Sequence, residues 1–218
     1  MTGLRRTMSV AAVVAAAMVF GTTTATHAAV TFTLDDYAVT VNSTDPGLVI
    51  QQQELLGTPW VFDLELGQST TVDLFEIWTD EGSVNWDDLT PKDISVAFSF
   101  SSPPPPFDGS STGHTAGQWL FGAIQWGDVV WNSPLELPLG YLGDGMLKIT
   151  LSNETFNEGL FGLSEGPGYG ATVEATFTLL AEPTAIPEPA SMLVWGSLGL
   201  LSVVAVTARR NKARRSRA

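Results

Sequence analysis

The chain has no cysteine, few histidines and, over most of its length, almost no basic side chains. Without cysteine no disulfide can form, so core packing alone must hold the folded part together. His114 is the only histidine beyond residue 29. Zinc sites and Ser-His-Asp triads depend on histidine or cysteine, and the surrounding Gly/Ser-rich stretch predicts an exposed loop. We therefore expect no zinc, no catalytic residue and no enzyme.

Basic residues are scarce because they are confined to the two ends of the chain. The whole chain of 218 residues has a formal net charge of −13. Between residues 30 and 187, two lysines (Lys92 and Lys148) stand against 22 carboxylates, which leaves −20 for that span. Such a surface repels phosphate backbones, so we expect no nucleic-acid partner; it attracts divalent cations instead.

The N-terminal residues are arranged as in a secretory signal peptide. Arg5 and Arg6 precede a short apolar run over residues 9–20, and small residues follow up to Ala29. This order predicts export with cleavage after Ala28 or Ala29, so that residues 1–29 are removed. An uncleaved membrane anchor is the alternative.

The C-terminal residues predict a membrane span with its basic side inside. Residues 191–208 are eighteen residues without a charge, which as a helix would extend about 27 Å and just cross a bilayer. Six basic side chains follow in residues 209–218. Under the positive-inside rule this stub stays cytoplasmic, and residues 30–182 form the ectodomain.

The tail as a whole, residues 183–218, resembles a known sorting signal. Pro187-Glu188-Pro189 comes directly before the apolar span and the arginine cluster. This order is similar to the PEP-CTERM sorting signal of Gram-negative bacteria. The resemblance implies that an exosortase, a membrane-embedded processing enzyme, recognises the motif and removes the tail, so that the protein reaches the cell surface or the extracellular matrix. It also implies an association with exopolysaccharide and biofilm. A plain tail anchor is the alternative.

Between the ends, the hydrophobic pattern has a period of two. It is clearest in WVFDLEL (60–66), ISVAFSF (94–100), MLKITLS (146–152) and TVEATFTLL (172–180). Such alternation predicts half-buried antiparallel strands, and hence an all-β sandwich or jelly roll. The parity slips between Leu74 and Phe75, which predicts a bulge or a strand covered on both faces. Residues 47–57 fit a short helix or a strand, and Pro103–Pro106 predicts a stiff extended linker.

One loop concentrates carboxylates. Residues 79–93 contain Asp80, Glu81, Asp87, Asp88 and Asp93. Calcium is bound by six to eight oxygens from flexible loops, so we hypothesise a calcium site formed by these five side chains. The EF-hand spacing is absent, and a solvated acidic loop is the alternative.

Six tryptophans lie in the ectodomain, and their rings can pack in a core or against sugars. Trp60 has the parity of core residues, and Trp119 and Phe121 look similar. Trp86, between Asn85 and Asp87, is the ring most expected to be exposed, and is the candidate carbohydrate-binding residue.

Three functions remain open. The favoured one is an exported, non-enzymatic structural or adhesive protein of the surface or matrix. The alternative is a carbohydrate-binding module, either without a cofactor or dependent on calcium. A polysaccharide-active enzyme comes third, because abundant carboxylates alone are weak evidence for glycoside hydrolysis.

Overall fold

The computed structural model describes residues 28–184, which form eleven strands and one turn of 3-10 helix. The predicted signal peptide, apart from its last two residues, and the tail from residue 185 onward lie outside the described residues. Among residues 28–184, no helix is long and apolar enough to span a membrane. The all-β prediction is confirmed.

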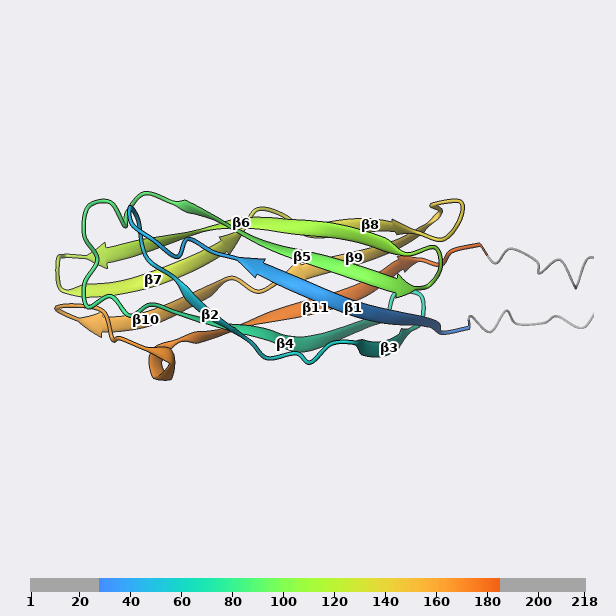
Figure 1. Cartoon of the computed structure of the whole chain (residues 1–218), viewed down its shortest axis with the longest axis horizontal. Helices are drawn as coiled ribbons and strands as arrows, with labels where there is room; N and C mark the ends of the chain where they lie inside the picture. Colours follow the sequence, from blue (N-terminus) through green and yellow to red (C-terminus); the bar gives the residue numbers. More distant parts are fainter. Residues whose placement is uncertain (1–27, 185–218) are drawn as a thin grey trace, which may run out of the picture.

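The strands form two curled antiparallel sheets (Figure 1). The first has the order β10-β7-β6-β5-β1-β3 and consists of β10 (Glu154–Leu160), β7 (Ile124–Trp131), β6 (Phe107–Leu120), β5 (Lys92–Ser102), β1 (Val30–Thr40) and β3 (Trp60–Leu64). The second has the order β2-β4-β11-β9-β8 and consists of β2 (Gln51–Glu54), β4 (Ser69–Trp78), β11 (Ala171–Ala181), β9 (Gly145–Leu151) and β8 (Leu135–Leu139). Residues 51–54 are thus strand and not helix.

Aromatic rings join the two sheets across one hydrophobic core. The ring of Phe177 on β11 lies 5.2 Å from that of Phe62 on β3, and 6.1 and 6.3 Å from those of Phe98 and Phe100 on β5. At the edge of this cluster, the ring of Trp60 stacks on that of Phe62 with 4.2 Å between centroids. Aromatic residues bury large areas, so these contacts between sheets account for much of the cohesion of a chain without disulfides.

The predicted alternation is confirmed in the central strands. Along β5, the apolar residues from Ile94 to Phe100 are buried at every second position, and β9 and β11 repeat the pattern. Leu66 departs from it: the side chain is exposed because β3 ends at Leu64 and the chain turns there.

The bulge predicted in β4 is present. Val173 pairs with Phe75 and Glu174 with Asp73, so Leu74 is the extra residue and both Leu74 and Phe75 are buried. The carbonyl oxygen of Leu74 accepts a hydrogen bond from the buried hydroxyl of Tyr37 at 2.6 Å. The same carbonyl also accepts from the Leu55 and Leu56 N–H groups at 3.0 and 3.2 Å, so the bulge presents one backbone acceptor both to the chain beside it and to a side chain of the opposite sheet.

The Gly/Ser-rich stretch around His114 is a strand, so its prediction as a loop is wrong. It forms β6 between β5 and β7, with His114 opposite Asp93 and Val130. Small residues are needed here because a Cβ on Gly113 would lie 2.5 Å from the carbonyl oxygen of Val130. Pro103–Pro106, predicted as a stiff extended linker, does follow a strand and forms the bent connection of the β5–β6 hairpin.

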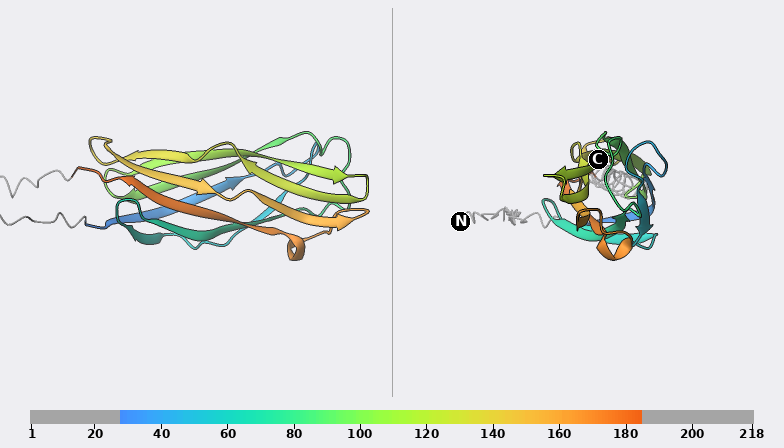
Figure 2. Two further views of the ribbon diagram at one scale, coloured as in Figure 1. Left: turned by 180° about the vertical axis from the view of Figure 1, so that it is seen from behind. Right: turned by 90° about the vertical axis from the view of Figure 1, so that its left-hand side faces the viewer.

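The domain is elongated, and both ends of the described chain lie at the same end of it (Figures 1 and 2). The loop between β8 and β9 is also at that end, where Asp144 accepts a hydrogen bond from the backbone of Thr184. We call the opposite end the apex. It is made of the loop of residues 79–91, the β6–β7 turn (121–123) and the segment 161–170 that follows β10.

Candidate functional site

The backbone of the acidic loop, residues 79–91, is hydrogen-bonded to β6, to β7 and to the segment that follows β10. The Gly117 N–H on β6 donates to the Asp88 carbonyl at 2.8 Å, and the Leu163 N–H donates to the Gly82 carbonyl at 3.0 Å. The side-chain oxygen of Gln125 on β7 accepts from the Val84 N–H at 2.6 Å. A Cβ on Gly117 would meet the Val84 side chain at 2.8 Å, so glycine lets the loop approach the strand.

Asn157 holds the second half of the apex to the first. This buried side chain on β10 accepts from the Thr79 N–H at 2.9 Å. Its amide nitrogen donates to the carbonyls of Ser164 and, at 3.1 Å, Gly166. With a φ of 54°, its backbone is in the left-handed region, which asparagine tolerates better than most residues. One side chain thus joins the start of the acidic loop to the 161–170 segment.

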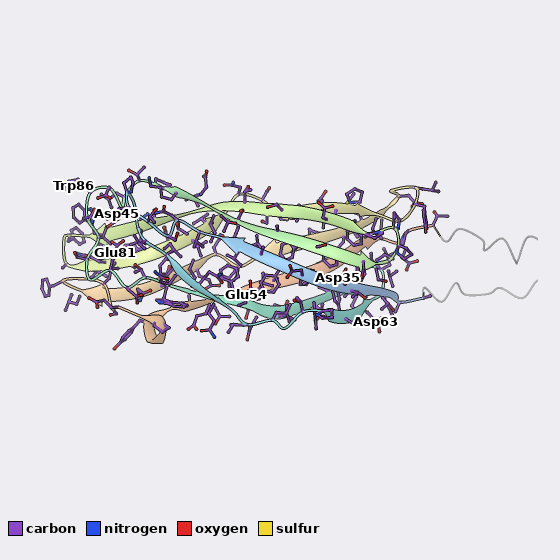
Figure 3. The ribbon with its side chains drawn as sticks, in the orientation of Figure 1. Asp35, Asp45, Glu54, Asp63, Glu81 and Trp86 are labelled. Carbon is purple, nitrogen blue, oxygen red and sulfur yellow. The ribbon has the colours of Figure 1, made fainter. Side chains whose placement is uncertain are left out.

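Large apolar side chains are exposed together at this apex. Trp86 is 78% exposed, Phe121 95% and Phe161 79%. The Trp86 ring meets that of Trp119 edge to face, with 5.1 Å between centroids, and the Phe161 N–H donates to the Ala123 carbonyl in the β6–β7 turn. We call these residues the apex patch, which also includes neighbouring leucines: Trp86, Trp119, Leu120, Phe121, Leu160 and Phe161. Figure 3 shows Trp86 at the extremity of the domain.

Trp86 is exposed, as predicted, whereas the expectation that Trp119 and Phe121 lie in the core is wrong. Trp119 is 38% exposed and Phe121 is fully outside the core. Both lie where β6 ends: Trp119 is its penultimate residue, and Phe121 begins the turn to β7. Period-two parity predicts burial only while a strand is covered by the opposite sheet, and β6 has passed that point.

Phe121 and Phe161 also adopt backbone conformations that are unfavourable for their type. Their φ angles are 53° and 61°, in the left-handed region that favours glycine. Such a conformation costs about 1 kcal/mol for a residue with a Cβ. Neither exposed ring is buried in return, so stability of this chain alone does not explain why phenylalanine stands at either position.

The structure brings together only part of the predicted calcium set. Glu81 and Asp88 are in contact through their carboxyl groups, and the charges of Asp45 and Asp87 act on this pair. Asp80 is exposed and lies on the side of Gly166, whereas Asp93 is on β5 opposite His114. Asp45, which comes from the turn before residue 48, was missed because it is far away in sequence. Figure 3 shows Asp45 and Glu81 close to one another at the apex.

Backbone donors hold the two carboxyl groups in place. Glu81 accepts from the Val49 N–H at 2.7 Å, and Asp88 accepts from the Asn85 N–H at 2.7 Å. Burial raises the pKa of both carboxyl groups, and repulsion between the two raises that of Glu81 further. Asp88 has no exposed surface, and its Oδ1 has no hydrogen-bond partner. Among residues 28–184, no three His, Asp or Glu side chains are already placed as a metal-ligand set.

Comparisons with known proteins leave the site to be judged on its own chemistry. No family model matches the chain, no curated protein is similar to it, and no solved structure matches the fold.

Proposed function

We propose that the protein is an exported, non-enzymatic β-sandwich protein of the cell surface or extracellular matrix, and that the apex patch is its adhesive surface. The observation that carries this proposal is that exposed aromatic side chains gather at the end of the domain opposite the chain ends. If the C-terminal span anchors the protein before processing, the apex is the part that faces away from the membrane.

Two energetic arguments support an adhesive apex. Contiguous exposed apolar patches are rare on soluble proteins unless they contact a partner. In addition, the left-handed backbones of Phe121 and Phe161 cost free energy that the folded chain does not recover. Both observations are accounted for if the rings are buried when the protein binds.

Matrix polysaccharide is the ligand that this surface fits best. Aromatic rings pack against the apolar faces of sugars, and the edge-to-face contact with Trp119 holds Trp86 in an exposed position. The formal charge of −20 between residues 30 and 187 would repel an anionic polymer. We therefore propose a neutral or weakly charged glycan, which makes the carbohydrate-binding module a closely related second candidate.

Sorting through the C-terminal tail belongs to the same proposal. Pro187, Glu188 and Pro189 would be read by an exosortase, and the basic stub would hold the chain in the membrane until then. Mass spectrometry of the surface or secreted protein tests this. Recovery of mature protein with residues 209–218 still attached would contradict processing.

The adhesive role is tested by co-sedimentation of the full chain with the producing cell's own exopolysaccharide. Trp86→Ala with Phe121→Asn should weaken binding about tenfold or more, because two exposed anchors are lost. The matched control is Tyr141→Ala with Leu142→Ala, which removes similarly exposed apolar surface from the β8–β9 loop at the other end. Equal binding by the apex and control variants would contradict the proposal.

A further inference from the structure

The contact between Glu81 and Asp88 needs a positive partner. Two carboxylates in contact repel each other, so such a pair must either share a proton or hold a cation between them. Their other charged neighbours, Asp45 and Asp87, are negative too. Between residues 28 and 184 the chain has only Lys92 and Lys148 to offer. Lys148 is on β9 in the second sheet, and Lys92, whose side chain packs against Gly47, is not among the groups that act on the Glu81 and Asp88 carboxyls.

Asp88 supplies the observation that points to a ligand. Its side chain is completely buried, and the Asn85 N–H satisfies Oδ2, whereas Oδ1 has no donor unless the Glu81 carboxyl carries a proton. A buried carboxylate oxygen that lacks a donor destabilises the folded state. Native proteins keep such an atom mainly where a water, an ion or a ligand completes it.

We propose that Glu81 and Asp88 hold a calcium ion at the base of the apex, with Asp45 closing the solvent side. The available ligand atoms are all oxygens. Hard cations such as calcium prefer oxygen ligands, whereas many transition metals favour nitrogen or sulfur. Since no three carboxylates are preassembled, the ion takes two from the contact pair, draws in the exposed Asp45 side chain and completes its shell with water. A site of this kind belongs to the weak class of extracellular modules, with a Kd of about 0.1–1 mM.

Such an ion would join two segments that are far apart in the sequence. Glu81 accepts from Val49, and Asp87 accepts from the Gly47 N–H at 2.9 Å. The Thr79 hydroxyl also donates to the Val49 carbonyl at 2.7 Å. Binding would therefore clamp the 45–49 turn to the loop that carries Trp86. The site does not depend on polysaccharide binding, so the two proposals can fail separately.

Isosteric amides give a sharp test. In Glu81→Gln with Asp88→Asn, the amide oxygens can still accept from the backbone N–H groups of Val49 and Asn85, so the fold is kept while both charges are removed. The matched control is Asp73→Asn with Glu174→Gln, which removes two exposed carboxylates that face each other on β4 and β11.

The first measurement is the melting temperature of the full chain in nonionic detergent, with EDTA or with calcium at constant ionic strength. At ten times Kd, calcium should raise the midpoint of the wild type and of the control by about 3–6 °C. The amide variant should not respond, and in EDTA it should melt above the wild type because the repulsion is gone. The second measurement is terbium luminescence sensitised by Trp86, which the amide variant should lose.

Three results would overturn the proposal. One is an equal rise with magnesium and calcium, which would show screening of surface charge only. Another is a calcium response that persists in the amide variant. The third is a wild type that ignores calcium and binds no terbium but becomes more stable on acidification to pH 5, which would show that the pair holds a proton instead.

Discussion

Replacing Asn157 by alanine is expected to lower the free energy of unfolding by about 4 kcal/mol. The buried side chain makes three hydrogen bonds to backbone groups of Thr79, Ser164 and Gly166. At about 1 kcal/mol each these contribute roughly 3 kcal/mol. Alanine would also have to adopt the left-handed φ of 54°, at a further cost of about 1 kcal/mol.

Glycine at the same position separates the two contributions. Asn157→Gly loses the same hydrogen bonds but adopts a positive φ without strain, so it should cost about 3 kcal/mol. Asn157→Asp keeps the acceptor for Thr79 but turns a carboxylate oxygen towards two carbonyls, and should be no more stable than the alanine variant. The order Gly above Ala is thus expected from the backbone alone.

Urea unfolding of the full chain in nonionic detergent, followed by tryptophan fluorescence, measures these differences. A shift of the midpoint at an unchanged slope reports stability rather than a change in compactness. A loss below about 1 kcal/mol for both Asn157→Ala and Asn157→Gly would refute the reasoning, because it would mean that the three hydrogen bonds do not hold the apex together.

Three further variants test other parts of the structure. Asp128→Asn should raise the melting temperature at pH 7 but not below pH 3.8. Burial raises the pKa of Asp128, so the stability that the protonated side chain contributes is fully present below its ordinary pKa and is lost as pH rises through the raised pKa. Gly127→Ala should cost about 1–3 kcal/mol in urea unfolding, since its Cβ would lie 2.3 Å from the Phe156 ring; Gly57→Ala, in open space, is the control. Tyr37→Phe should cost about 1–2 kcal/mol by the same assay, because it leaves the bulge carbonyl without its hydroxyl donor; burial also raises the Tyr37 pKa to about 12, so its deprotonation should not be visible in an absorbance titration below pH 11.

The strands that fill the core could be predicted because their signal is local. In ISVAFSF, each residue's neighbours two positions away reveal its face, and the opposite sheet covers the whole run. The bulge at Leu74 was predictable for the same reason, since two adjacent apolar residues break the alternation within a single strand. Nothing beyond one strand's own sequence was needed in either case.

The errors occur where burial depends on a partner distant in sequence. Glycines in β6 look like a loop, but Gly113 is small because Trp131 and Val130 pass close to it. Trp119 and Phe121 keep strand parity, yet no opposite strand reaches them. Asp45 joins the carboxylate pair through the return of a turn some forty residues away. Composition and periodicity do not contain these distances, so the apex could be predicted only in part.

Two kinds of departure from local rules coincide at one end of the domain. Phenylalanines with left-handed backbones and exposed tryptophans each reduce stability, and both belong to the apex. Buried polar atoms without a partner are spread more widely: Asp88 lies in the apex loop, but Gln52, Thr115 and Asp128 lie in β2, β6 and β7. At the other end, where the chain enters and leaves, Asp144 ties the last described residue to a loop. Natural sequences violate consistency mainly where function requires it. Two different kinds of violation that share one end therefore support a binding role for the apex more strongly than any single exposed ring would. Phe121→Asn provides the corresponding check, since it should leave stability unchanged or raise it by about 1 kcal/mol while adhesion falls.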